Sequence, residues 1–405
     1  MQTENALDMQ HRLDRLISYL ESDPDNINLA ADVVGAAIAL GDWDQAQLVL
    51  DQYLSFVSES PLLKFHQSII HIHNMAFALA EPLLETLWLE GMQDLNTAYA
   101  YALVLLNLAR PDEARDKLLP YLAAPNSAEF TESVNAYLPQ QLLLARCLQH
   151  LRQSDASILL INKILEYHPD NFEARCMLVQ LYGDLRINDK AIALADELLS
   201  LDSDNAEANS VLGSLALDDF EFTRAEQFFN NALSRKANSG RALLGKAVIA
   251  LARQETEKAD KLFADAVEFM PLHIGAAVAH GWCKIALADY TAAEAVFEKA
   301  LLRERTFGET HAGLGIALFF QDRYEEAKRC LKIAKRLSLP DTISVTYLES
   351  LFTFKDVSTK QGLKTATDMF SKPFGPKNQP LFELMISLQH QVAREAEEKV
   401  SKNSK

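Results

Sequence analysis

The chain has 405 residues, of which 49% are hydrophobic and 8% aromatic, and it contains only 14 Gly and 13 Pro. This composition is that of a globular protein, and it favours helix because residues that interrupt helices are scarce. The net charge is -17, from 39 Lys and Arg against 56 Asp and Glu, so the surface as a whole repels phosphate groups. Nucleic acids and anionic membranes are therefore excluded as expected partners.

The N-terminal sixteen residues lack the basic start and apolar run of a targeting signal, and no later stretch approaches the ~18 consecutive apolar residues of a membrane span. Four scattered cysteines form no Cys-x-x-Cys pair, which argues against a disulfide scaffold and a zinc site. We expect a cytoplasmic protein that has no metal, no cofactor and no membrane contact.

An amphipathic helix is predicted at the start of the chain. Leu13, Leu16, Ile17 and Leu20 form one apolar stripe, and Pro24 ends it. Residues 1–26 are therefore interpreted as an N-terminal capping helix.

A period of 34 residues follows. Alanine recurs at this spacing at Ala46, Ala80, Ala114, Ala191, Ala225, Ala259, Ala293 and Ala327. The series is interrupted once by nine extra residues, and one of its positions is occupied by Ser157. The period defines nine units, which begin at Ile27, Pro61, Leu95, Leu138, Phe172, Ala206, Gly240, Ile274 and Gly308. Units 1–3 occupy residues 27–128, an insertion occupies 129–137, and units 4–9 occupy 138–341.

Each unit carries two helical apolar patterns separated by a short polar turn. In the sixth unit, Ala225, Phe229 and Ala232 lie on one face of the second helix. One unit cannot bury its apolar face alone, so the units are expected to stack. We treat the insertion 129–137 as a tolerated one, with a hinge or a loop over the binding surface as alternatives.

Residues 342–405 are predicted to form a helical cap and tail. We expect helices near 342–354 and 361–370, a segment of helix breakers, and an amphipathic helix over 381–400. This segment carries nine Lys and Arg against seven Asp and Glu, which leaves a charge of -19 on the preceding 341 residues.

The repeats resemble the tetratricopeptide repeat family. The resemblance rests on a small residue at repeat position 8 (Gly213, Gly281), alanine at position 20, a bulky residue at position 24 (Phe229, Phe297) and a small residue at position 27. It implies an all-α fold, a right-handed superhelical solenoid of antiparallel helix pairs, whose first helices line a concave groove that holds segments of other proteins.

The groove positions that the resemblance implies are 2, 5, 9, 12 and 13 of each unit. They give an apolar early zone, a polar centre and an apolar late zone, with these candidate partner-binding residues: Phe65, Ile69, Tyr99, Leu103, Arg146, His150, Gln180, Asp184, Ser214, Asp218, Val248, Trp282, Ile285, Ile316 and Phe319. Position 9 never carries asparagine, so the carboxylate clamp by which some relatives hold chaperone tails is rejected.

Two occupants of the late zone are left open. One is an apolar or amphipathic segment of a protein or peptide partner, anchored on Trp282 and Phe319. The other is the chain's own helix 381–400, which a tether would hold at high effective concentration. The expected function is a scaffold, adaptor or chaperone, for which the resemblance suggests a bacterial secretion, appendage or signalling assembly. The alternatives are a peptide- or signal-sensing regulator and the substrate-recruiting arm of an enzyme complex.

No catalytic residues are predicted. Gly240, Gly245 and Lys246 match the spacing of a phosphate-binding loop, but Ala247 replaces the hydroxyl residue that binds magnesium, and the segment reads as helix. His66 and His73 stand seven residues apart on one helix, or ~10 Å, which is too far to share a metal ion. The four cysteines fit best as small packing residues.

Overall fold

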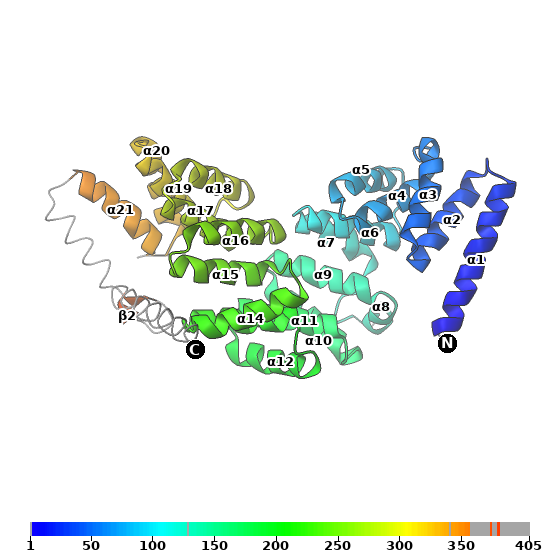
Figure 1. Cartoon of the computed structure of the whole chain (residues 1–405), viewed down its shortest axis with the longest axis horizontal. Coiled ribbons are helices and arrows are strands. Elements are labelled where there is room, and N and C mark those ends of the chain that lie inside the picture. Colours follow the sequence, from blue (N-terminus) through cyan, green and yellow to red (C-terminus); the bar gives the residue numbers. More distant parts are fainter. Residues whose placement is uncertain (1, 128, 340–341, 357–372, 375–378, 381–405) are drawn as a thin grey trace, which may run out of the picture. The chain divides into compact units, whose positions relative to one another are not determined.

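The computed structural model describes residues 2–127, 129–339, 342–356, 373–374 and 379–380. These residues divide into two compact units, Met1–Met177 and Leu178–Lys405, and the division falls inside one helix. We call them the N-terminal and the C-terminal unit. Figure 1 shows that each consists of helices, most of which pack beside a neighbour in the sequence, as α4 does beside α5 and α15 beside α16.

The N-terminal unit contains α1 (Gln2–Ser22), α2 (Ile27–Leu40), α3 (Trp43–Gln52), α4 (Pro61–His73), α5 (Phe77–Leu89), α6 (Leu95–Asn107), α7 (Pro111–Leu118), α8 (Phe130–Ala136), α9 (Leu138–His150), α10 (Ser154–Tyr167), the 3-10 turns η1 (Leu54–Phe56) and η2 (Leu119–Tyr121), and the first part of α11 (Phe172–Asp184).

The C-terminal unit contains the rest of α11, then α12 (Asn188–Leu201), α13 (Ala206–Asp218), α14 (Phe222–Arg235), α15 (Gly240–Ala252), α16 (Thr256–Phe269), α17 (Ile274–Ala286), α18 (Tyr290–Arg303), α19 (Gly308–Phe320), α20 (Tyr324–Leu337) and α21 (Ile343–Asp356), followed by the two-residue antiparallel strands β1 (Pro373–Phe374) and β2 (Gln379–Pro380). Among the described residues the fold is thus an all-α repeat of antiparallel helix pairs apart from this short ladder, as the sequence predicted.

The first helix of every repeat starts at the residue where the 34-residue period begins a unit. Asn26, Asn171 and Asn205 stand just before α2, α11 and α13, and their side-chain oxygens accept hydrogen bonds from the amides three residues later. Such caps satisfy amide groups that the first turn of a helix leaves without a partner. An asparagine therefore caps the first helix of repeats 1, 5 and 6.

Each first helix ends in the same turn. Position 15 of every repeat adopts a left-handed backbone, at Gly41, Met75, Ala109, Arg152, Arg186, Phe220, Gln254, Ala288 and Asp322. The next amide donates to the carbonyl five residues back, as Asp42 does to Ala37 at 2.9 Å and Arg323 to Leu318 at 3.0 Å. This is the Schellman arrangement, which satisfies the last carbonyls of a helix and reverses the chain within two residues.

Aromatic side chains at position 24 fill the space between consecutive first helices. Phe229 is fully buried and lies against Gly213 of its own repeat and Gly245 of the next. A methyl group on Gly213 would come within 2.5 Å of the Phe229 ring, and one on Gly245 would come closer still. The small residues are therefore required for the aromatic ring to fit between the helices.

The chain elements outside the period also pack through apolar faces. Leu13 and Leu20 of α1 are buried in one hydrophobic cluster with residues of α2. The inserted segment forms α8, whose Phe130 and Val134 are buried and contribute to the core. The third predicted trailing helix, 381–400, and the one near 361–370 lie outside the described residues.

Helix α21 occupies the place that the first helix of a tenth repeat would take. It begins at Ile343, packs on α19 and α20, and buries Leu348 fully. Its position agrees with the helix expected near 342–354. Within the ranges described, no helix combines the length and apolar character that crossing a membrane requires.

Candidate functional site: the surface of the first helices

Most of the candidate residues lie partly or fully exposed on the first helices of their repeats. In the N-terminal unit these are Phe65, Ile69, Tyr99, Leu103, Arg146 and His150, and in the C-terminal unit Gln180, Asp184, Ser214, Asp218, Val248, Trp282, Ile285 and Phe319. Ile316 is the exception, because it is fully buried in one hydrophobic cluster with Leu348 and Phe352 of α21. The expectation that Ile316 contacts a partner is therefore wrong for this structure.

In the N-terminal unit, a polar group interrupts the apolar first-helix surface. Arg146 at position 9 of its repeat donates from Nη2 to Oε1 of Glu173, at position 2 of the next, over 2.6 Å. Burial raises the pKa of the neighbouring Tyr99 hydroxyl, and the charge of Glu173 raises it further while Arg146 opposes the shift. Positions 2, 5 and 9 of consecutive first helices therefore meet on one surface.

The histidines of α4 have separate environments. His73 stacks on Trp43 with ring centroids 3.8 Å apart, whereas His66 lies against Gly35 and its Nδ1 has no hydrogen-bond partner. Burial lowers the pKa of His66, which keeps the imidazole neutral near pH 7. In the ranges that the structure describes, no three His, Cys, Asp or Glu side chains gather in a way that could hold a metal ion.

In the C-terminal unit, the polar centre surrounds a cavity of about 190 Å³. Its wall is formed by Gly183, Asp184, Arg186, Val211, Ser214, Leu215, Asp218 and Arg241. Arg241 donates from Nη2 to Oδ1 of Asp184 over 2.5 Å, although the two residues belong to first helices separated by α13. A second ion pair joins Arg186 to Asp218. We call this group the polar cavity.

Sequence reasoning found the two aspartates and Ser214 of the polar cavity but missed both arginines. Arg241 occupies position 2, one of the implied groove positions, so the same criterion could have identified it. Arg186 sits in the left-handed turn at position 15, where no groove residue was expected. The long guanidinium side chain reaches the cavity from that turn, which repeat position alone does not reveal.

Beyond the polar cavity, the first-helix surface becomes apolar. Val248 and Leu251 of α15, Trp282 and Ile285 of α17, and Phe319 of α19 are partly buried. We call these five residues the apolar strip. Part of the strip already has a covering inside the chain, since Phe319 packs edge-on against Phe352 of α21 with ring centroids 5.0 Å apart.

One acidic side chain adjoins the strip. Glu309 occupies position 2 of the last repeat, and its side chain is partly buried. Burial raises the pKa of its carboxyl group, with no other contribution. Among the described residues, no hydrogen bond or ion pair reaches this carboxylate, in contrast to Glu173 at the same repeat position.

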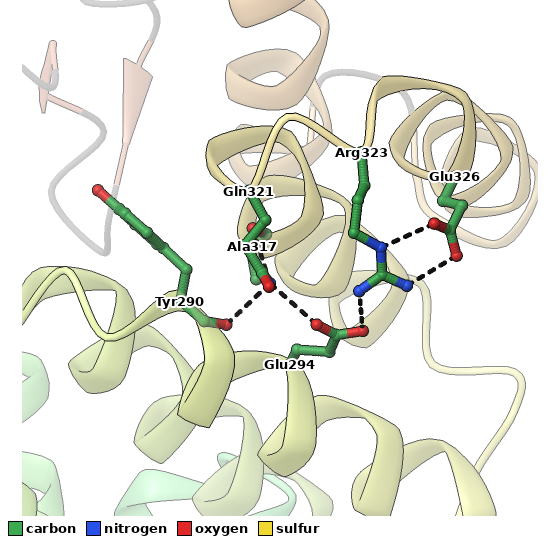
Figure 2. Close-up of polar contacts among 6 residues, drawn as sticks. All are labelled: Tyr290, Glu294, Ala317, Gln321, Arg323 and Glu326. Carbon is green, nitrogen blue, oxygen red and sulfur yellow. Dashed lines mark hydrogen bonds and ion pairs between the residues drawn. The ribbon is translucent and has the colours of Figure 1, made fainter.

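A second kind of polar group lies between repeats, at the turns. Figure 2 shows Arg323, which precedes α20, bonded to Glu326 of its own repeat and to Glu294 of the preceding repeat. Its Nε donates to Glu326 over 2.7 Å and its Nη1 to Glu294 over 2.5 Å. Gln321 Nε2 donates to the same Glu294 at 2.9 Å. Arg110 makes the same pair of bridges, to Glu113 and Glu81, in the N-terminal unit. These contacts connect repeats and engage all three guanidinium nitrogens of both arginines.

The segment with phosphate-loop spacing and the four cysteines have structural roles in this fold. Gly240, Gly245 and Lys246 lie within helix α15, where Lys246 donates to Asn230 at 2.8 Å, so no phosphate-binding loop forms. All four cysteines are buried. Burial raises the pKa of Cys147 to about 12 and of Cys283 and Cys330 to about 11, which leaves these thiols protonated and poorly nucleophilic.

No known protein family matches the chain in sequence, and no curated protein matches it. Solved structures do match, among them a tetratricopeptide repeat protein from Parabacteroides merdae, 18% identical over 64% of this chain and 99% of that one, with a TM-score of 0.38. PilF of Pseudomonas aeruginosa is 16% identical over 49% of this chain and 88% of that one, with a TM-score of 0.40.

A third match is YrrB, described as a tetratricopeptide repeat protein with an unusual peptide-binding site. It is 18% identical over 47% of this chain and 97% of that one, with a TM-score of 0.35. The resemblance of this chain to the family rests on its own features: helix pairs repeat every 34 residues, and small residues at position 8 face bulky residues at position 24. On these features, the tetratricopeptide repeat is the family that the chain resembles, in its sequence pattern and in its helix pairs.

Proposed function

We propose that this protein is a scaffold or adaptor that binds a segment of another protein on the first-helix surface of its C-terminal unit. The supporting observation is the continuity of that surface. Position 9 presents Gln180, Ser214, Val248 and Trp282 on four successive first helices, and each side chain is partly exposed. A surface that extends over four helices suits an extended or helical polypeptide.

The size of the polar cavity argues for a polypeptide over a small molecule. Its volume is about 190 Å³, whereas ligand pockets in proteins measure roughly 300–1,000 Å³. A cavity of this size accommodates one side chain of a partner. The signal-sensing alternative, which requires a pocket that encloses its ligand, is therefore less well supported than a binding surface for protein.

The chemistry of the surface indicates an amphipathic partner segment. The polar cavity offers the charged pairs Asp184–Arg241 and Asp218–Arg186, and the apolar strip offers Trp282 and its neighbours. Partly exposed aromatic side chains are the usual anchors of protein interfaces. We propose binding in place of catalysis, since the thiols are protonated and the charged groups of the cavity are paired with one another.

The experiment is affinity capture from cells that express the natural protein, with three forms of the full-length chain as bait. These are the unmodified chain, a Val248→Ser/Trp282→Ala variant, and a control with Phe269→Ala/Leu302→Ser on the exposed sides of α16 and α18. We expect the unmodified chain and the control to capture the same protein, and the first variant to lose it.

A fourth bait guards against a folding defect at Trp282, whose ring packs on Phe297. Ser214→Arg fills the polar cavity while leaving the apolar contacts in place, so it should also reduce capture. Identical capture by all four baits would overturn the proposal. The protein captured also decides among the secretion, appendage and signalling assemblies that the family resemblance suggests.

A further inference from the structure

Among the described residues of the C-terminal unit, Glu309 is a charged side chain of the first-helix surface that has no hydrogen bond or ion pair. The carboxylates of the polar cavity are each bonded to an arginine, Asp184 to Arg241 and Asp218 to Arg186. Glu309 is partly buried, and among the described residues no donor reaches it. Its oxygens are not among the fully buried polar atoms that lack a partner, so the carboxylate is accessible to a donor from a ligand.

Glu309 and Trp282 hold repeat positions at which the side chains of consecutive repeats meet elsewhere in the chain. Arg146 and Glu173 hold positions 9 and 2 of consecutive repeats, and their side chains touch at 2.6 Å. Trp282 and Glu309 hold the same two positions in the last two repeats. The contact between Arg241 and Asp184 shows that position 2 faces the same surface in the C-terminal unit as well.

A cation would therefore meet two favourable groups at this point. The Glu309 carboxylate supplies the charge, and the indole of Trp282 supplies a ring whose face attracts cations. In the N-terminal unit the chain provides this cation itself, since Arg146 pairs with Glu173. In the last two repeats tryptophan replaces the arginine, so the cation has to come from the ligand.

We infer that the partner segment is a basic amphipathic one, with a lysine or arginine that pairs with Glu309 and apolar side chains that cover Val248, Trp282 and Ile285. This inference rests on the proposed function and specifies the chemistry of the partner. Charge complementarity supports it, because a chain with a net charge of -17 attracts basic segments and repels acidic ones.

The test uses two synthetic peptides of eighteen residues, labelled with fluorescein, that form amphipathic helices. One consists of Leu and Lys, and the other has Glu in place of every Lys. Fluorescence anisotropy with the full-length chain should show that the Lys peptide binds at least about tenfold more tightly than the Glu peptide, the factor that 1.4 kcal/mol provides.

Glu309→Gln should weaken binding of the Lys peptide about fivefold, because the substitution removes the charge and keeps the shape. The control Glu325→Gln removes one negative charge from an exposed position on α20 and should change binding less than about twofold. Equal effects of the two substitutions would show that only the overall charge acts, and would overturn the inference.

Two further outcomes separate this inference from the proposed function. If Val248→Ser/Trp282→Ala abolishes binding of the Lys peptide while Glu309→Gln does not, the surface binds a segment but Glu309 does not select it. If a chain truncated after residue 356 binds the peptide more than tenfold better than the full chain, the tail occupies this surface in place of a separate partner. Either result overturns the inference and leaves the capture experiment to decide the proposed function.

Discussion

The packing between helices of the C-terminal unit repeats itself, whereas the surface of its first helices does not. Phe229 lies between Gly213 and Gly245, and two repeats later Phe297 lies in the same way between Gly281 and Gly313. Position 9 on the surface changes from Gln180 to Ser214, Val248 and Trp282 over the same stretch. Packing constrains the residues between helices, and the surface residues are free to serve binding.

The polar contacts divide in the same manner. Arg110 and Arg323 make the same pair of bridges at the same repeat position, one in each unit. The surface ion pairs Arg146–Glu173 and Arg241–Asp184 join different repeat positions. A bridge that recurs at one position serves the stacking of repeats, whereas pairs that vary with position give each part of the surface its own chemistry.

The largest expected effect is on the packing side of this comparison. Phe229→Ala removes a fully buried ring from between two helices and should lower the free energy of unfolding by about 3–5 kcal/mol. Phe228→Ala, on the same helix but only partly buried, should cost clearly less. Urea unfolding followed by circular dichroism measures the stability of both variants. Equal losses of unfolding free energy would contradict the packing of Phe229 between consecutive first helices.

Gly245→Ala should destabilise the chain by about 1–3 kcal/mol through overpacking. The new methyl group would overlap the Phe229 ring, which is held on its other side by Gly213 and cannot withdraw without moving a helix. A chain that carries both Gly245→Ala and Phe229→Leu should be destabilised by less than the sum of the two single effects, because the smaller side chain makes room for the methyl group. Strict additivity of the two effects would contradict direct contact.

Substitutions in the left-handed turns between helices should change the free energy of unfolding by about 1 kcal/mol. Gly41 has a φ of 77°, and a methyl group there would meet no atom within 4 Å, so Gly41→Ala tests backbone strain alone. The reverse change, Ala288→Gly at a φ of 56°, should be neutral or stabilising. Thermal unfolding of both variants checks the pair, and a stabilising Gly41→Ala would contradict the left-handed turn.

A smaller effect is expected at His66 and only in acid. Its pKa is lowered from 6.5 in the folded state, so as the pH falls below 6.5 the unfolded chain takes up the proton first. The stability that the neutral imidazole contributes is therefore present above pH 6.5 and is lost as the pH falls through the folded-state pKa. His66→Gln should remove this part of the pH dependence, which urea unfolding at pH 7.5 and 5.5 would show. An unchanged dependence would mean that His66 is solvated.

The sequence predicted the fold well because the period is a packing requirement. Alanine at position 20 and glycine at position 8 lie where helices touch, so their recurrence located the start of every first helix. The insertion 129–137 was harder to interpret. Its helix α8 has only seven residues, which is too short for a periodic pattern to reveal that Phe130 is buried. The contact from the Tyr53 hydroxyl to the carbonyl of Pro24, which connects the first repeat to its preceding turn, was not predicted either.

The site was predicted less completely, because repeat position indicates a direction and does not indicate partners. The criterion selected Asp184 and Asp218 but could not show that both are already paired, since Arg241 lies 57 residues from Asp184. It also selected Ile316, which α21 covers, and helix α21 lies outside the period. Glu309 satisfies the same criterion, and only its lack of a partner among the described residues distinguishes it.

The smallest effect on stability is expected at the polar cavity, and it sharpens the comparison most. Asp184→Asn breaks the ion pair with Arg241, but both side chains are partly exposed, so the free energy of unfolding should change by less than about 0.5 kcal/mol. Capture of the partner should nevertheless fall, because Arg241 then faces the cavity with its charge uncompensated and repels a basic segment. Glu221→Gln, which breaks the exposed pair with Arg224 on the same unit, should alter neither quantity. A loss of stability at Asp184 as large as that at Gly245 would place the polar cavity among the packing contacts and remove it from the binding surface.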